Sequence, residues 1–474
     1  MIAWRSRDLP NTLAAALCLA SIGLAANLSA KLHSVKTAHV IAWGWLLAGF
    51  INAAVGLVQY FGLLSEPLGT AFGLLRQRNQ LATLCNIALL SLLFIWQRRS
   101  AEPKAAKRMT YLSAAVCALL TAALAATCSR AGLLELFTLC AFALVWAKVK
   151  RRRDVLAAAI LALLTYVIWA FLLPLMSGSP ETIFGRVTSF AAASDGSTDM
   201  QLQDSRSVLW GNTLALIRLQ PLLGVGWREL AHALQTSDLE SLPRFAAQAD
   251  NAHNLPLQFA AELGLPFTVL WFGLLAWLFL RHRPWRAHAP EQVLAWGVLA
   301  IMGLHSLLEY PLWYAPFQIA VGLSAGALFT QAKPAQSRTG NASASLVWHG
   351  LASICLLFFC VYAAFDYHRI RQLFLAADER SILYSDGAYT KAEASWLFAS
   401  QVRFAKLTTT PVTSSNAAEI WKLGHEVLYF SPEPLVFQKL ISAGAWLAPH
   451  DPTIAAELIA HQKQLHVLET SRLH

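Results

Sequence analysis

Ten apolar runs, each of roughly 20 residues, constrain the fold of this chain more than any other feature. They cover residues 11–30, 38–63, 80–97, 110–128, 131–147, 155–176, 263–280, 291–309, 312–330 and 346–365. Such a run can cross a bilayer, and inside the bilayer it satisfies its own backbone only as a helix. Only 14% of the 474 residues are charged, against about 25% in a typical soluble domain. The chain is therefore predicted to be all-α, a polytopic transmembrane helix bundle of about ten spans.

Two long polar stretches interrupt the apolar runs and predict a division into four parts. These are N-terminal transmembrane helices over 1–176, a large loop over 177–262, further transmembrane helices over 263–365 and a tail over 366–474. The loop contains an amphipathic patch from Val208 to Leu219, and its length favours a functional role. The tail is predicted to be a module of short amphipathic helices, for example over 389–407, 416–429 and 453–468.

Basic residues gather in four stretches between the apolar runs and predict the orientation of the chain. Cytoplasmic loops carry an excess of Lys and Arg, and an even number of runs separates each stretch from the next. The polar connections near 64–79, 129–130 and 310–311, the loop and the tail are then expected to face the periplasm. Counting backwards places the N-terminus outside, although Arg5 and Arg7 favour the opposite. Either the first run is not a full span, or an N-terminal helix present in longer relatives is absent. The four stretches are Arg98–Arg108, Lys148–Arg153, Arg281–Arg286 and the pair Lys333 and Arg338.

Charge and cysteine content argue against other classes of protein. The net charge of +10 is explained by basic cytoplasmic loops, and no basic run interleaved with aromatic residues indicates nucleic-acid binding. The seven cysteines lie in or at the end of apolar runs, without the spacing of zinc ligands or of a disulfide framework. No metal or cofactor is predicted.

Unusual polar residues collect at the ends of the runs that are predicted to face the periplasm. Ionisable groups near hydrocarbon are costly and point to function, although snorkelling arginines and lipid anchoring explain a single case equally well. The clustering of several segments on one membrane face favours a site. The segments are Arg76–Gln80, Ser129–Gly132, Ser205–Trp210, Pro221–Trp227, Asp250–Leu255 and His305–Tyr314.

His253 has two interpretations of equal weight on spacing alone. An imidazole that titrates near neutrality beside Asp250 suits a general base. A histidine in an interfacial loop also serves as an ordinary hydrogen-bonding residue, and Asp250, Asn251 or Asn254 can cap the helix that follows. Gly224 and Gly226 are interpreted as turn glycines after Pro221.

At these residues the sequence resembles the bacterial O-antigen ligase and polymerase superfamily, and more narrowly the O-oligosaccharyltransferases that glycosylate pilins and other exported proteins. The resemblance spans residues 70–330 and is carried by six strings. They are Gln77–Ala82, Ser129–Gly132, Ser205–Trp210, Pro221–Trp227, Asn251–Gly264 and Glu309–Tyr314. Members have about twelve membrane helices, against the ten expected here.

The resemblance implies a reaction and a set of site residues. Members move a glycan from a polyprenyl-pyrophosphate carrier to an acceptor hydroxyl at the outer face of the inner membrane. A metal is not chemically required, because pyrophosphate is already a good leaving group, and the sequence offers no acidic cluster to hold one. By matching positions, the resemblance implies His253 as the leading catalytic residue, with Arg206 acting on the pyrophosphate. It implies that substrate-binding residues are Arg130, which also contacts the pyrophosphate, together with Gln77, Asn79, Gln80, Asn254 and Tyr310.

Three alternatives to a protein-glycosylating enzyme stay open. A ligase or polymerase would use lipid A-core or a repeat unit as the acceptor, with the same donor chemistry. A flippase for the same lipid-linked glycans would show polar or discontinuous helices near the midplane, whereas the helices here are almost uncharged through their centres. A scaffold that only binds partners through the tail would leave the membrane arginines unexplained.

Overall fold

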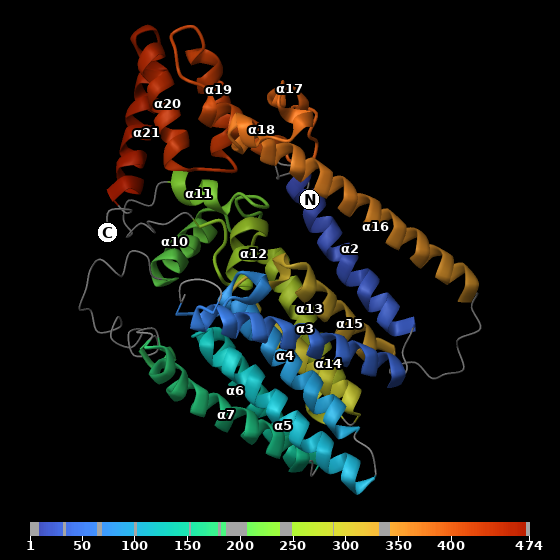
Figure 1. Cartoon of the computed structure of the whole chain (residues 1–474). Helices are drawn as coiled ribbons and strands as arrows, with labels where there is room; N and C mark the ends of the chain where they lie inside the picture. Colours follow the sequence, from blue (N-terminus) through green and yellow to red (C-terminus); the bar gives the residue numbers. More distant parts are fainter. Residues whose placement is uncertain are drawn as a thin grey trace. The chain divides into compact units, whose positions relative to one another are not determined.

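The computed structural model describes residues 9–31, 35–63, 69–98, 102–150, 153–178, 182–185, 206–237, 249–287, 289–330 and 342–470. All regular secondary structure in these ranges is helical, and each predicted apolar run coincides with a helix to within a few residues (Figure 1). The predicted all-α fold class is confirmed. The fourth basic stretch, the pair Lys333 and Arg338, lies outside the described residues.

Ten long helices correspond to the ten apolar runs. Seven of them, among the described residues, are long and apolar enough to cross a membrane, while α2 and α15 carry shorter apolar stretches, Leu19–Ser29 and Ala315–Leu328. The chain therefore has the helices of a multi-pass membrane protein. The ten are α2 (Leu9–Lys31), α3 (Val35–Phe61), α4 (Arg78–Gln97), α5 (Pro103–Ala126), α6 (Arg130–Lys150), α7 (Arg153–Ser177), α13 (Leu265–His282), α14 (Pro290–Leu308), α15 (Ala315–Thr330) and α16 (Ala342–Arg371).

The chain divides into two compact units. We call Cys18–Ser197 with Gly273–Arg338 the membrane unit, and Met1–Leu17 with Thr198–Phe272 and Thr339–His474 the loop–tail unit. The membrane unit also contains the short 3-10 helices η1 (Gly73–Leu75), η2 (Pro284–Arg286) and η3 (Pro311–Trp313). The predicted loop from Thr198 onward and the whole predicted tail belong to the same unit, whereas the loop residues before Thr198 belong to the membrane unit.

Helix α4 is the core of the membrane unit. Fifteen of its 20 residues are buried, and α3, α5, α6 and α14 pack around it. Small residues permit this close packing. A Cβ atom added at Gly132 of α6 would lie 2.4 Å from Ala82 Cβ, and one at Gly297 of α14 would lie 2.7 Å from Leu90. Because α4 has so little surface left for lipid, its polar residues face other helices.

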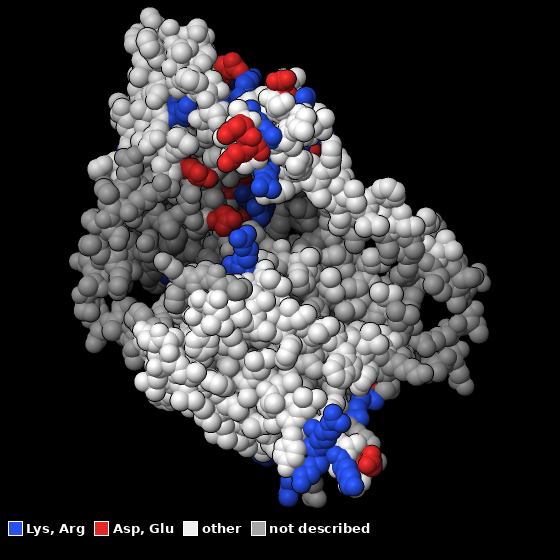
Figure 2. Space-filling model, in the orientation of Figure 1, with Lys and Arg blue, Asp and Glu red and all other residues white. Residues whose placement is uncertain are grey.

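One end of the membrane unit is basic. At the end of α4, Arg98 pairs with Glu291 at the start of α14, and Lys104 and Lys107 are exposed nearby on the first turns of α5. Figure 2 shows this basic group at the lower edge of the view, below a broad surface with few charges. The Trp146 indole N–H at the end of α6 donates to the Pro284 carbonyl. This hydrogen bond links the residues just before the second basic stretch to the third basic stretch. The polar starts of α4 and α6 lie at the opposite ends of these helices.

The loop–tail unit is built from short helices around two apolar cores. One core joins the three loop helices and is formed by Leu209, Leu216, Leu230, Ala261 and their neighbours; the predicted amphipathic patch is α10. The other joins the last tail helices through residues such as Val427, Phe437 and Leu440. The helices are α10 (Arg206–Leu219), α11 (Leu230–Thr236), α12 (Leu255–Leu263), η5 (Gln372–Phe374), η6 (Ala377–Glu379), η7 (Ile382–Tyr384), α17 (Ala388–Ala392), α18 (Ala399–Thr409), α19 (Ala417–Leu428), α20 (Pro434–Leu447), η8 (Ala448–His450) and α21 (Pro452–Thr470).

The tail is a helical module, as predicted, with one difference in its first helix. The helix expected over 389–407 is interrupted between α17 and α18. Asp366, buried on α16, accepts hydrogen bonds from the Ser395 hydroxyl (2.9 Å) and the Leu397 backbone N–H (3.0 Å). A buried carboxylate needs such donors, and supplying them takes the chain out of the helical path at these residues.

Candidate active site

The residues predicted from the sequence fall into two groups, one in each unit. Arg206, His253 and Asn254 belong to the loop–tail unit. The membrane unit contains the others, which are Gln77, Asn79, Gln80, Arg130 and Tyr310.

In the membrane unit, Asn79 joins three segments that are far apart in the sequence. Its side-chain carbonyl accepts a hydrogen bond from the Ser129 hydroxyl at 2.7 Å, and its amide donates to Glu309 at 3.0 Å. Arg130 follows Ser129 directly, and Tyr310 follows Glu309. The sequence predicts that these three segments meet at one end of the bundle, and the hydrogen bonds of Asn79 bring them together. We call this end of the bundle, formed by residues 77–80, 129–130 and 309–310, the polar rim.

The rim residues differ in how much they are exposed. The Gln77 side chain caps α4 by accepting from the Gln80 backbone N–H at 2.7 Å, and the Gln80 side chain itself is buried. Arg130, the first residue of α6, is exposed, whereas Tyr310 is partly buried against Trp313 and Tyr314. Of these four residues, Arg130 alone carries a charge, and its side chain is exposed.

Beneath the rim lies a buried polar network. His305 belongs to one of the clustered polar segments that the sequence singles out, but the sequence predicts a role in the reaction for neither His305 nor Glu135. Glu135 of α6 and His305 of α14 are fully buried, with His305 Nδ1 3.2 Å from Glu135 Oε1. The Thr83 hydroxyl lies 2.7 Å from the same carboxylate oxygen and also contacts His305. Asn86 donates to the other oxygen at 3.0 Å. The available signal was the presence of an acid and an imidazole inside otherwise apolar runs.

In the loop–tail unit, a tight turn just before α12 holds His253. The His253 backbone N–H donates to the side chain of buried Asn251 at 3.0 Å, and its φ of 49° is left-handed. The Ala252 N–H donates to Gln258 at 2.7 Å, and Asn254 caps α12 by accepting from the Leu257 N–H at 3.0 Å. A non-glycine residue in the left-handed region is held by its surroundings, and such residues concentrate at functional sites.

Trp210 connects the His253 turn to Arg206. Its indole N–H donates to the carbonyl of Ala252, the residue before His253, at 2.8 Å. Arg206 is the first residue of α10, four positions before Trp210, and residues four apart lie on the same helix face. Trp210 therefore joins α10, which begins at Arg206, to the turn that contains His253.

Two backbone segments, residues 221–226 and the end of α12 with its C-cap, residues 261–265, pack directly on each other. The Val225 N–H donates to Ala261 at 2.8 Å, and the Leu265 N–H donates to Pro221 at 2.8 Å. A Cβ atom at Gly264 would lie 2.2 Å from the Leu222 carbonyl oxygen. Gly224 and Gly226 have φ values of 65° and 121°, so the prediction that they are turn glycines is confirmed.

Glu262 lies in the same packing, at the end of α12. Burial raises the pKa of its carboxyl group to about 8, although the nearby Arg228 and the backbone N–H groups of Arg228 and Leu230 act in the opposite direction. The carboxyl group is therefore largely protonated at neutral pH. In that state it is a neutral support of the loop beside Arg228.

Comparison with protein families covers most of the chain. Residues 114–272 match the family described as O-Antigen ligase, and residues 293–460 match the family described as Virulence factor membrane-bound polymerase, C-terminal. Together the two matches support the O-antigen ligase superfamily for this chain. The first match contains Arg130, Arg206 and His253, and the second contains Tyr310, whereas the residues at the start of α4 precede both.

A curated relative supports the same family. The chain is 24% identical over 266 residues to a General O-oligosaccharyltransferase of Acinetobacter baylyi (strain ATCC 33305 / BD413 / ADP1). The match covers 54% of this chain and 44% of the relative. The chain thus spans less than half the length of the relative it matches.

Proposed function

We propose that this chain is an O-oligosaccharyltransferase of the bacterial inner membrane. It would move a glycan from a polyprenyl-pyrophosphate carrier to a Ser or Thr hydroxyl of an exported protein such as a pilin. The observation that carries this proposal is the connected arrangement of Arg206, Trp210 and the His253 turn. The curated relative, a General O-oligosaccharyltransferase, supports transfer of an oligosaccharide to an oxygen atom.

A periplasmic site follows from the orientation of a single span. Helix α13 begins directly after the loop at Leu265 and is followed by Arg281, Arg283 and Arg286. If these arginines are cytoplasmic, as the excess of Lys and Arg predicts, the loop leaves the membrane on the periplasmic side. The pyrophosphate of a lipid-linked donor lies at headgroup level, where Arg206 and Arg130 can meet it without crossing hydrocarbon.

The proposed reaction is one displacement at the anomeric carbon. The acceptor oxygen forms a bond to that carbon, the bond between the carbon and the phosphate oxygen breaks, and the polyprenyl pyrophosphate leaves. His253 takes the proton of the acceptor hydroxyl, which is a weak nucleophile until it is deprotonated. Arg206 and Arg130 stabilise the negative charge that grows on the pyrophosphate, because guanidinium stays protonated and binds two oxygens at once.

The remaining predicted residues have supporting roles in this proposal. Asn254 holds the His253 turn through the α12 cap, and Asn79 holds Ser129 beside Arg130. Gln77, Gln80 and Tyr310 complete the polar rim near the sugar and the headgroups. The chemistry requires no metal ion at the reacting atoms, because pyrophosphate is already a good leaving group.

A flippase is the competing class, and the Glu135–His305 pair is the observation that favours it, since buried ionisable pairs occur along transport pathways. However, Glu135 lies five residues after the start of α6, and His305 three residues before the end of α14. Both are about one turn from the rim rather than at the midplane. This position fits a support for the rim better than a transport site.

Reconstitution of the purified protein with lipid-linked glycan tests the proposal. Pilin and lipid A-core are offered separately as acceptors, and glycan transfer is followed by mass spectrometry. We expect transfer to pilin, and its loss by a factor on the order of 10²–10⁴ in His253→Ala. Exposed His450 in the tail provides the matched control His450→Ala. Transfer to lipid A-core alone would refute pilin as the acceptor and favour lipid A-core. Normal transfer by His253→Ala would refute His253 as the base.

A conservative substitution tests the arginine. Arg206→Lys keeps the charge but loses the planar pair of donors, so we expect transfer to fall at least about tenfold. Arg218→Lys, at the other, exposed end of the same helix, should transfer normally. Equal rates in the two variants would remove Arg206 from the mechanism.

A further inference from the structure

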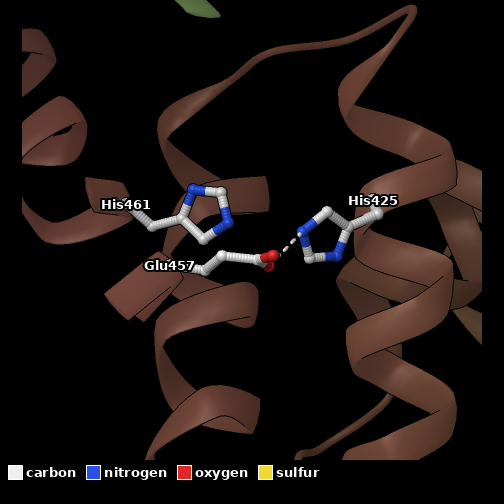
Figure 3. Close-up of side chains that lie close together, drawn as sticks. All are labelled: His425, Glu457 and His461. Carbon is white, nitrogen blue, oxygen red and sulfur yellow. Dashed lines mark ion pairs between the residues drawn. The ribbon is translucent and has the colours of Figure 1, made fainter. Parts of the chain in front are cut away.

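Three potential metal ligands meet in the tail, in a part of the loop–tail unit that the proposed reaction does not use. His425 comes from α19, and Glu457 and His461 come from α21 (Figure 3). One ligand atom from each residue lies within 4.8 Å of the other two. Two imidazoles and a carboxylate are a ligand set that proteins use for Zn²⁺.

The spacing of these residues suits a metal ion. Glu457 and His461 are four positions apart on α21, so they project from one helix face. His425 Nε2 lies 3.4 Å from Glu457 Oε2. Two ligand atoms at roughly 2.0–2.1 Å from a tetrahedral Zn²⁺ would be separated by about 3.4 Å. The pair is therefore already at the separation that a shared ion would require.

The tautomer of His425 is set for metal binding. Its Nδ1 lies 2.9 Å from the Trp421 carbonyl oxygen, so Nδ1 carries the proton that is donated there. In the neutral ring, Nε2 then has a lone pair that faces the Glu457 carboxylate. A histidine that donates one ring N–H to a backbone carbonyl is the usual outer-shell arrangement of a metal-bound imidazole.

His461 supplies a second, independent observation. It is only 8% exposed and lies between the rings of Trp421 and Phe437, each with its centroid 5.8 Å away. Within the described part of the chain neither ring nitrogen makes a hydrogen bond; Gln464 approaches the ring without reaching hydrogen-bond geometry. Buried polar groups without a partner are rare and call for an explanation. In Figure 3 the ring lies beside the Glu457 carboxylate and opposite His425.

We propose that His425, Glu457 and His461 bind one divalent transition-metal ion, with Zn²⁺ favoured by the nitrogen and oxygen ligands. Three protein ligands leave a fourth position for water. His425 and Glu457 are 35% and 55% exposed, so an ion can enter from solvent. The ion would fix α19 to α21 as a structural clamp.

This clamp would also hold the tail against the loop. Tyr429, four residues after His425, stacks on His232 of α11 with ring centroids 4.2 Å apart. Gln464, three residues after His461, donates to the Gln235 carbonyl of α11 at 3.0 Å. Both contacts with α11 therefore lie about one turn beyond the metal ligands on the same two helices.

Metal binding to the 474-residue chain in detergent, with any affinity tag removed, tests the proposal. The protein is equilibrated with Zn²⁺ or Co²⁺, separated from free ion and analysed for metal content. We expect one ion per chain and, with Co²⁺, the intense visible absorption of a tetrahedral site. His425→Gln and Glu457→Gln should each weaken binding at least about 100-fold, since loss of an outer-shell partner alone costs 10–100-fold. His450→Gln, an exposed histidine of the same module, should bind as the wild type does.

Hydrogen exchange provides a second measurement, because a variant that fails to bind could have misfolded. Zn²⁺ should slow amide exchange in α11, α19 and α21 of the wild type, relative to protein treated with a chelator. In Glu457→Gln, exchange without metal should equal that of the wild type, and Zn²⁺ should have no effect. Wild-type protein that retains no more metal than His425→Gln, or equal losses in His450→Gln, would overturn the proposal.

Discussion

Gly264 tests whether close backbone packing holds the His253 loop. Its φ of 85° and ψ of 163° lie in a region that is essentially restricted to glycine. In Gly264→Ala the new Cβ atom would lie 2.2 Å from the Leu222 oxygen and 2.5 Å from the Leu222 carbonyl carbon. These are backbone atoms that cannot rotate away, so segments 221–226 and 261–265 must separate by roughly 1 Å to reach ordinary contact.

The separation would weaken the hydrogen bonds between the two segments. These include Leu265 N–H to Pro221 at 2.8 Å and Gly226 N–H to Glu262 at 3.1 Å. Losing two such bonds costs about 2 kcal/mol, and the backbone conformation adds about 1–3 kcal/mol. The local free energy of opening should therefore fall by about 3–5 kcal/mol. Gly387→Ala is the control, since Gly387 has a φ of 62° but no atom within 4 Å of its added Cβ.

Amide exchange followed by mass spectrometry measures the effect. We expect peptides covering 221–226 and 261–265 to exchange at least about 100-fold faster in Gly264→Ala, because 1.4 kcal/mol corresponds to a factor of ten. Glycan transfer should fall in the same variant, since the two segments hold the end of α12, the helix that follows the His253 turn. Gly387→Ala should leave both measurements unchanged. If Gly264→Ala exchanges like Gly387→Ala, the two segments do not pack as described.

Three further predictions concern other parts of the site. Burial raises the Glu262 pKa to about 8, so between pH 4.5 and about 8 the folded state holds a proton that the unfolded state loses. The free energy of unfolding should therefore fall as the pH rises through this range. Thermal unfolding of Glu262→Gln should lack this pH dependence. Trp210→Phe keeps an aromatic ring but removes the N–H that donates to Ala252, so a kinetic assay should show transfer slowed by about tenfold. Exposed Trp446→Phe should transfer at the normal rate. His305→Ala should destabilise the protein by about 3 kcal/mol in denaturant unfolding, and less when combined with Glu135→Gln; strictly additive losses would show that the pair is not coupled.

The sequence was sufficient to predict the helical architecture. Apolar runs of membrane length have one way to satisfy their backbone, so the ten helices follow from composition and length. The break between α17 and α18 was not predictable from amphipathic periodicity, because it depends on Asp366 accepting hydrogen bonds from Ser395 and Leu397. A local pattern carries no information about such a distant acceptor.

The candidate site was predictable only in part. The polar string around Asn79 and the segments of Ser129 and Glu309 were recognisable because charged and amide side chains are rare at the ends of apolar runs. The contact of Trp210 with Ala252 was not, since tryptophan in a membrane protein is explained equally well as an interfacial anchor. His425 and His461 were overlooked because they are 36 residues apart, and only the packing of both α19 and α21 on α20 brings them together.

The burial of α4 has a consequence for the order of biosynthesis. Thr83 and His305 are separated by 222 positions, and domains generally form from the N-terminus during translation. While α14 is still in the ribosome, Glu135 has only the α4 side chains Thr83 and Asn86 as partners. The first helices must therefore wait in the bilayer as an incomplete assembly, and His305 closes the bundle late.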